Sequence, residues 1–142
     1  MSKETNKAVE RSIVVEVINK GNMGVLDECL THDFVYHGLG GVEVRGIPGY
    51  KQFTSALRST YPDIHVTIED ILAEGDLVAT RTFCTFTFTG KAGPDNPHGQ
   101  RVSMAGSILD RFRDGRIAET WEQYDRLDLY QQLGMLPVKP LL

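Results

Sequence analysis

The chain has 142 residues, of which 41% are hydrophobic and 24% charged, and its formal net charge is −4 at pH 7. This length and composition are typical of one globular domain, residues 1–142, that buries a substantial core. The basic residues are dispersed, without a Lys/Arg block or a basic stripe interleaved with aromatic residues. We therefore expect no binding to nucleic acid and no attachment to a membrane surface.

No targeting or membrane segment is expected. The N-terminal residues contain no apolar run long enough for a signal-peptide core, and no stretch approaches the roughly 20 apolar residues of a membrane span. These features predict a cytoplasmic protein. Cys29 and Cys84 are isolated, without CxxC spacing or a Cys/His cluster, so we expect two reduced core thiols and neither a disulfide nor a metal site.

Helices are predicted in the first part of the chain. Apolar residues recur at helical spacing until Gly21-Asn22 ends the pattern. These residues are Val9, Ile13, Val17 and Ile18. A second, short helix is predicted over residues 23–30. After the segment "HDFVYHGLGGVEVRG", which predicts a short extended stretch opening into a Gly-rich loop, a third helical pattern includes Tyr50 and Phe53 and ends at Pro62.

Strands are predicted in the second part, where the hydrophobic period changes to two. The candidates cover residues 63–72, 77–89, 101–112 and 116–125, and short turn-like segments join them. Neighbouring strands are therefore expected to be antiparallel. We predict an α+β fold in which a curved antiparallel sheet is wrapped as a cone and the N-terminal helices close a pocket. A β-bulge or a twist between Phe83 and Phe86 would reconcile their different parity.

The last hairpin decides which side chains share a face. A two-residue turn at Asp114-Gly115 predicts that Phe112 pairs with Ile117, Asp110 with Glu119, and Ile108 with Trp121. One face then carries aliphatic, aromatic and acidic residues together: Met104, Ile108, Asp110, Phe112, Ile117, Glu119, Trp121, Gln123 and Asp125. Because an unpaired buried carboxylate is costly, the acids lie either at a solvated rim or along a cavity.

Two stretches resemble a known family, "PDIHVTIEDILAEGDLVATR" and "RFRDGRIAETWEQYDRLDLYQQLG". Their most specific motifs are Pro62-Asp63, Glu74-Gly75-Asp76, Arg111-Phe112 followed by Asp114-Gly115, and the run from Trp121 through Asp125 to Gln132-Leu133-Gly134. In this order and spacing they resemble the SnoaL-like polyketide cyclases, a branch of the nuclear-transport-factor-two-like cone fold. The resemblance covers nearly the whole chain, beginning with "HDFVYHG".

The resemblance implies an intramolecular aldol ring closure on an aromatic polyketide ester, without a metal or an organic cofactor. It implies that one acid on the last strand takes a proton from an activated carbon, and the matching position here is Asp125. A desolvated carboxylate with a raised pKa is able to act as such a base. Asp125 is also suited to capping a helix that begins at Arg126, and both roles stay open.

Other positions are candidates for the same site. His37 is a second catalytic candidate, which would orient a substrate oxygen or relay a proton at the mouth, or else be a solvated loop histidine. Trp121 is expected either as an aromatic wall for a flat substrate or as a core residue. Phe86 stands where many family members have a histidine in a Gly-Thr-His-Thr-Gly-like run, which implies a more apolar pocket. Glu119 either joins Asp110 at the site or forms an exposed ion pair. The further predicted substrate-binding residues are Tyr50, Phe53, Met104, Ile108, Arg111 and Gln123.

Three functions are compatible with these features. The first is a cofactor-free cyclase that binds a small apolar or aromatic ligand in the cone. The second is a hydrolase, dehydratase or isomerase of the same fold, similar to an epoxide hydrolase, in which Asp110, Glu119 and Asp125 converge. The third is a non-catalytic small-molecule-binding module. A semi-apolar surface from Arg81 to Phe88 also predicts a homodimer that forms through the sheet.

Overall fold

The computed structural model describes residues 2–137. The helices are α1 (Lys3–Ser12), which continues into the π-helical segment η1 (Ile13–Asn19), α2 (Leu26–Cys29), α3 (Gly46–Thr60) and α4 (Arg126–Gln132). The strands are β1 (Leu30–His37), β2 (Glu43–Arg45), β3 (His65–Glu74), β4 (Leu77–Thr87), β5 (Arg101–Arg113) and β6 (Arg116–Tyr124). Short 3₁₀ turns occupy Met23–Val25 and Leu39–Gly41.

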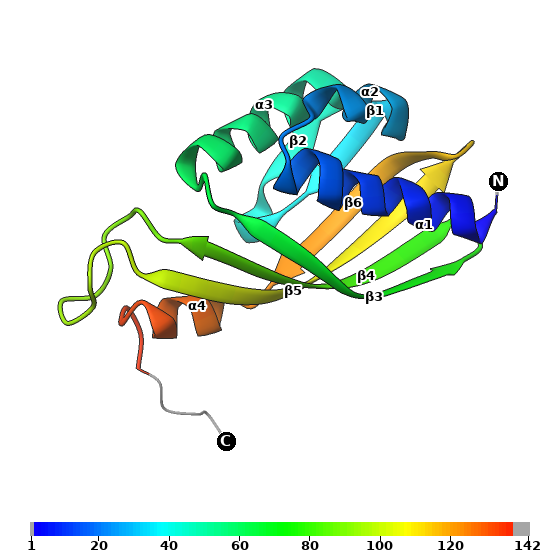
Figure 1. The fold of residues 1–142 in the computed structure, drawn as a ribbon. Helices are drawn as coiled ribbons and strands as arrows, with labels where there is room; N and C mark the ends of the chain where they lie inside the picture. The colour runs from blue at the N-terminus through cyan, green and yellow to red at the C-terminus, as the bar shows by residue number, and fades with distance from the viewer. Residues whose placement is uncertain (1, 138–142) are drawn as a thin grey trace.

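The strands form one curved sheet in the order β2-β1-β6-β5-β4-β3. The four strands predicted from the second part of the chain are β3 to β6, and they are antiparallel neighbours as expected. The early segment adds β1, which pairs with β6 in parallel, so the sheet is mixed. The helices α1, α2 and α3 cover the concave face, while α4 lies beyond the end of β6 (Figure 1). The predicted α+β class is confirmed.

The core lies between these helices and the concave face. Its most deeply buried large side chains include Leu26, Phe34 and Ile117. The ring of Phe34 meets that of Tyr50 edge to face, with their centroids 5.1 Å apart. The two cysteines are free and buried, as predicted. Within residues 2–137, no helix is both long enough and apolar enough to cross a membrane.

The first helix turns polar side chains toward the sheet. Its N-terminus is capped by Ser2, whose side-chain oxygen accepts a hydrogen bond from the backbone of Thr5 at 3.0 Å. The buried residues of α1 itself are Asn6 and Glu10, whereas the buried apolar residues begin in η1, with Ile13 as the first. A π-helical segment inside a helix is rare and often lies at a functional site.

A β-bulge on β6 controls which of its side chains face the core. Phe112 pairs with Ile117 as predicted, and the turn between them places Asp114 and Gly115 at φ 53° and 80°, as a two-residue hairpin turn requires. Arg111, however, pairs with Glu119, so Ala118 is the extra residue.

The predicted register beyond that point is wrong. Asp110 pairs with Thr120, and Ile108 pairs with Glu122, because the bulge shifts the alternation of β6 by one residue. The predicted bulge between Phe83 and Phe86 is also wrong. The pairing of β4 with β5 is unbroken, and those two rings face opposite sides of the sheet.

Candidate functional site

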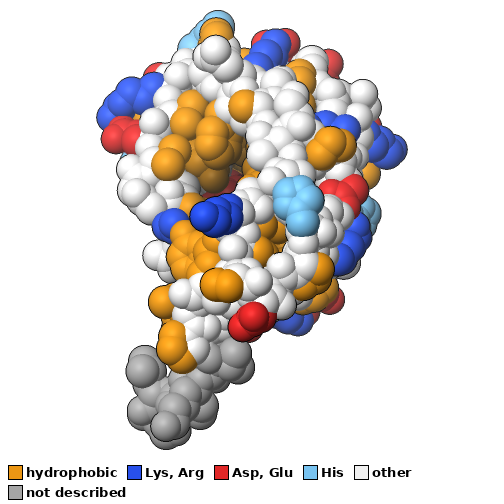
Figure 2. All heavy atoms as spheres, turned by 90° about the vertical axis from the view of Figure 1, so that its left-hand side faces the viewer, with side chains coloured by type: hydrophobic (Ala, Val, Ile, Leu, Met, Phe, Trp, Pro, Cys, Tyr) orange, Lys and Arg blue, Asp and Glu red, His pale blue; other side chains and the backbone are white. Residues whose placement is uncertain are grey.

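A cavity of about 320 Å³ lies between the concave face of the sheet and the helices α1, η1 and α3. Its walls are mostly aliphatic and aromatic, as is typical of sites that enclose small molecules. Figure 2 views the molecule from one end, where a hollow is bordered by hydrophobic side chains. Leu39, Leu57 and Leu129, from the loop after β1, from α3 and from α4, contribute to this wall.

The cavity wall also contains three carboxyl groups from three different elements, Glu10 of α1, Asp110 of β5 and Glu122 of β6. Asp110 and Glu10 are almost completely buried, with exposed fractions of 0% and 2%. Glu122 is partly exposed, and it borders the cavity. None of the cavity-lining residues in the described part of the chain is Lys, Arg or His. These carboxyl groups therefore have no basic partner in the cavity.

Two tyrosine hydroxyls face Glu122. The hydroxyl of Tyr36 donates a hydrogen bond to Oε2 of Glu122 at 2.8 Å, and the hydroxyl of Tyr124 lies on the same carboxyl. Burial raises the pKa of Glu122 from 4.5 to about 7; the hydrogen bonds from Tyr36 and Tyr124 oppose this rise, and the charge of Asp110 adds to it. Near neutral pH, Glu122 is thus able both to accept and to release a proton. Burial also raises the pKa of Tyr36, so that its hydroxyl stays a donor.

Asp110 lies between two further partners. Thr120, its cross-strand neighbour, donates a hydrogen bond to Oδ1 at 2.6 Å. The carboxyl of Glu10 faces that of Asp110, and a hydrogen bond between the two requires a proton on one of them. Burial raises the pKa of Glu10 well above its usual range, and the charge of Asp110 raises it further. Burial raises the pKa of Asp110 as well, although the hydrogen bonds from Glu10 and Thr120 oppose that rise.

Of the site residues predicted from the sequence, five contribute to the cavity wall. They are Tyr50 and Phe53 of α3, Phe86 of β4, and Met104 and Ile108 of β5. The ring of Phe86 packs against Tyr61, with the centroids 4.7 Å apart. This end of the cavity is therefore apolar, as the phenylalanine at position 86 implied.

Five other predicted residues lie on the opposite, convex face. Nε2 of His37 lies 2.6 Å from Oε2 of Glu119, and the imidazole stacks on Trp121 with the centroids 5.5 Å apart. Trp121 and Gln123 border a shallow depression of the convex face together with Arg111. The bulge at Ala118 is the reason that the β6 members of this group point away from the cavity. His37 points the same way because it follows the inward-facing Tyr36 along β1.

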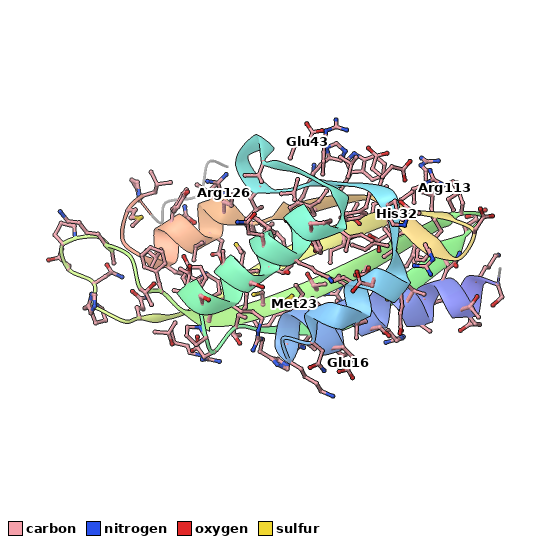
Figure 3. All side chains as sticks on the ribbon, turned by 90° about the horizontal axis from the view of Figure 1, so that it is seen from above. Glu16, Met23, His32, Glu43, Arg113 and Arg126 are labelled. Carbon is pink, nitrogen blue, oxygen red and sulfur yellow. The ribbon has the colours of Figure 1, made fainter. Side chains whose placement is uncertain are left out.

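Asp125 is exposed and lies outside the cavity wall. Its Oδ1 accepts a hydrogen bond from the backbone N–H of Asp128 at 3.0 Å, which caps the N-terminus of α4. The structure therefore places this side chain in the capping role, one of the two that the sequence left open. Its neighbour Arg126 reaches the loop after β1, where its guanidinium lies beside Gly40 (Figure 3).

The residues that sequence reasoning missed are Glu10, Tyr36, Thr120, Glu122 and Tyr124. A signal existed for Glu10, which stands three residues before Ile13 and seven before Val17, and so shares their helical face. Glu122 had no such signal, because its orientation depends on the position of the bulge. Within residues 2–137, no group of three or more His, Cys, Asp or Glu side chains is arranged to hold a metal ion.

Several solved structures are similar to this chain. IdmH of Streptomyces antibioticus, a candidate polyketide cyclase, is 29% identical, with a TM-score of 0.77 over 91% of this chain and 98% of IdmH. AclR of Streptomyces galilaeus, a candidate hydroxylase, is 28% identical, with a TM-score of 0.79 over 99% of this chain and 91% of AclR. A candidate SnoaL-like polyketide cyclase from Jannaschia sp. CCS1 has a TM-score of 0.80 over 95% of both chains; at 23% identity it supports the fold alone.

Among curated protein sequences, none matches this chain. The family comparison, in contrast, covers most of it, because residues 8–133 match the model of the SnoaL-like polyketide cyclases. This match and the curved mixed sheet covered by helices agree with the resemblance in the sequence. The chain belongs to the SnoaL-like polyketide cyclase family.

Proposed function

We propose that this protein is a cofactor-independent cyclase that closes a ring by intramolecular aldol addition on an aromatic polyketide ester, with Glu122 as the general base. The observation that carries the proposal is a carboxyl group whose pKa of about 7 matches proton transfer at neutral pH, in the wall of an apolar cavity. Asp125, the base suggested by the family resemblance, is already engaged as a helix cap.

The proposed reaction begins at a carbon flanked by carbonyl groups, which is already fairly acidic. Glu122 removes its proton, and the enolate carbon then adds to a ketone carbonyl of the same molecule. Once Glu122 has taken the proton and become neutral, the hydroxyls of Tyr36 and Tyr124, which face this carboxyl, can turn their protons to the enolate oxygen and stabilise its charge. The aromatic rings of Tyr50, Phe53 and Phe86 offer flat apolar contacts to a planar substrate.

The test is turnover of a panel of aromatic polyketide methyl esters, followed by absorbance. We expect Glu122→Gln to lose roughly 10²- to 10⁴-fold in kcat/KM, the range that a positioned general base contributes. Glu119→Gln is the matched control, because it makes the same change on the same strand but on the convex face. Full activity of Glu122→Gln, or an equal loss in Glu119→Gln, would contradict the proposal.

A hydrolase or dehydratase is the second candidate, and the three carboxyl groups of the cavity favour it. The version expected from the sequence used Asp110, Glu119 and Asp125, of which only Asp110 borders the cavity. A version with Glu122 as the base that activates water remains compatible with the site. Incorporation of ¹⁸O from labelled water into the product would identify hydrolysis, whereas an aldol closure incorporates none. The third function, a non-catalytic binder, predicts that Asp125 is engaged in capping, which agrees with its hydrogen bond to Asp128, and that no carboxyl group of the pocket has a raised pKa. The raised pKa of Glu122 favours catalysis over this function.

We also propose a homodimer that forms through the convex face of the sheet. Large apolar side chains are exposed there, including Leu72 at 69%, Phe83 at 41% and Leu109 at 37%. A second copy would bury these side chains together with Trp121. Sedimentation at micromolar concentration should give the mass of a dimer, and a monomeric species would contradict this proposal. The cytoplasmic location stays a prediction.

A further inference from the structure

The cavity contains two carboxyl groups that the proposed base mechanism does not use. Glu10 lies on the N-terminal helix α1, and Asp110 lies on β5, an interior strand of the sheet; both side chains border the cavity. The two groups are 2% and 0% exposed. Two buried carboxylates side by side without a cation would repel each other strongly, and burial would add to the cost.

Their hydrogen bonds show where a proton is needed. Oδ1 of Asp110 accepts a hydrogen bond from Thr120. Oδ2 of Asp110 is buried, and among the described residues no hydroxyl or N–H group donates a hydrogen bond to it. A buried acceptor without a donor is unfavourable, and more so when it is charged. A proton on Glu10 removes both problems, because it neutralises one of the two groups and supplies the missing donor to Asp110.

The surroundings favour this arrangement further. The other titratable groups that face the pair are Glu122, Cys29, Tyr50 and Tyr124, and each of them is neutral or negative near pH 7. No basic side chain lines the cavity within the described residues. The neighbouring groups therefore favour retention of a proton by the pair. The retained proton lies at the wall of the same cavity as Glu122.

We propose that Glu10 and Asp110 share one proton in the resting enzyme and deliver it to the carbonyl oxygen of the acceptor ketone when the ring closes. This inference rests on the proposed function. It assigns two separate proton sites to the reaction, with Glu122 as the base and the Glu10–Asp110 pair as the acid. Two sites remove the need for Glu122 to move its proton from the carbon on one side of the new bond to the oxygen on the other.

The step is balanced without any further reactant. The C–H bond breaks and its proton goes to Glu122; the electron pair forms the new C–C bond; and the π electrons of the acceptor carbonyl move to its oxygen. That oxygen takes the proton held by Glu10 and Asp110, which leaves the product alcohol. The cycle ends when the proton on Glu122 returns to the pair, so the net change is the transfer of one proton from carbon to oxygen.

Glu10→Gln is the variant that tests the acid. The amide of Gln keeps the size of the side chain and still donates a hydrogen bond to Asp110, but it has no proton to release. Ring closure of the methyl-ester panel should fall by at least about 100-fold. The base step should fall much less, as measured by deuterium uptake from D₂O into an ester analogue whose acceptor ketone is replaced by a methylene group. Equal losses in both assays, or no loss of ring closure, would overturn the acid role.

Two variants complete the design. Glu4→Gln is the matched control, since Glu4 lies on the same helix but is exposed and pairs with Lys7 at 3.1 Å. It should retain both activities. Asp110→Asn removes the charge of the acceptor and its capacity to share the proton, and it should also slow ring closure more than carbon exchange. If Glu10→Gln fails to fold, this second variant decides the question.

The shared proton is also measurable without a substrate, by the infrared carbonyl band of a protonated carboxylic acid. The Glu122→Gln background removes the contribution of the base, and exposed carboxyl groups are ionised at pH 8. The band should be present in Glu122→Gln and absent from the double variant that also carries Glu10→Gln. Absence of the band in Glu122→Gln would overturn the shared proton. If the band is present but the wild type turns over none of the esters, the shared proton stands and the proposed cyclase function is wrong.

Discussion

The two faces of strand β6 carry similar residues in different environments. On the convex face, Glu119 pairs with His37 beside Trp121, and the Glu119 side chain is 35% exposed. On the concave face, Glu122 lies beside Tyr36 and Tyr124 in the cavity wall, where burial raises its pKa to about 7. Each face thus combines an acid with aromatic rings. The difference shows that position relative to the sheet, and not residue type, makes one of these acids suitable for proton transfer.

The largest difference in stability is expected between a variant that loses an aromatic ring on the concave face of the sheet and one that loses a ring on its convex face. Phe34→Ala empties part of a fully buried core, and we expect it to lower the free energy of unfolding by about 3–5 kcal/mol. Phe83→Ala removes a ring that is 41% exposed on the convex face, so it should cost less than about 1 kcal/mol. Urea unfolding of both variants, at a concentration where the protein is monomeric, measures this difference. A large cost for Phe83→Ala in the monomer would mean that the convex face is part of the folding core.

The pH dependence of stability should separate the two glutamates on β6. The pKa of Glu122 in the folded protein, about 7, lies above its ordinary value of 4.5, so the folded state holds this proton more tightly than the unfolded state does. The wild type should then lose stability relative to Glu122→Gln as the pH rises from 4.5 to about 7. The difference should be close to zero below pH 4.5 and reach up to about 3 kcal/mol at pH 8.

Thermal or urea unfolding of the wild type and Glu122→Gln across pH 4–8 tests this expectation. Glu119→Gln serves as the control, because it changes only a partly exposed side-chain contact with His37, which is worth less than about 1 kcal/mol. A constant difference between the wild type and Glu122→Gln over this range would show that the pKa of Glu122 is the same in the folded and the unfolded protein, so that burial does not raise it. In that case Glu122 on the concave face would be no better suited to proton transfer than Glu119 on the convex face.

Most of the fold was predictable because its signals are local. The alternation of apolar residues and the short turns identified β3 to β6, and Asp114-Gly115 predicted a two-residue turn that the structure confirms. The parallel pairing of β1 with β6 was not predictable in the same way. It joins segments that lie about 80 residues apart, as in the pair of Tyr36 and Thr120, and no turn connects them.

The site was less predictable because the bulge at one residue, Ala118, determines which side chains of β6 face the cavity. In "RIAETWEQY" the apolar residues Ile117, Ala118 and Trp121 do not favour one register, so the sequence is compatible with either Trp121 or Glu122 facing inward. A bulge exchanges the two faces without changing the composition of the strand. Glu10 was missed for another reason, since a glutamate in a helix is normally exposed and only the packing of α1 against the sheet buries this one.

The smallest expected effect concerns Asp125, which joins the end of β6 to α4. If its role is to cap α4, Asp125→Ala should lower the free energy of unfolding by about 1 kcal/mol, because the backbone N–H of Asp128 loses its acceptor. Asp125→Asn should cost almost nothing, since Asn is an equally good N-cap. Both variants should keep the turnover of the wild type. A loss of about 100-fold in Asp125→Asn with unchanged stability would return the general base to Asp125 and leave Glu122 as a structural group.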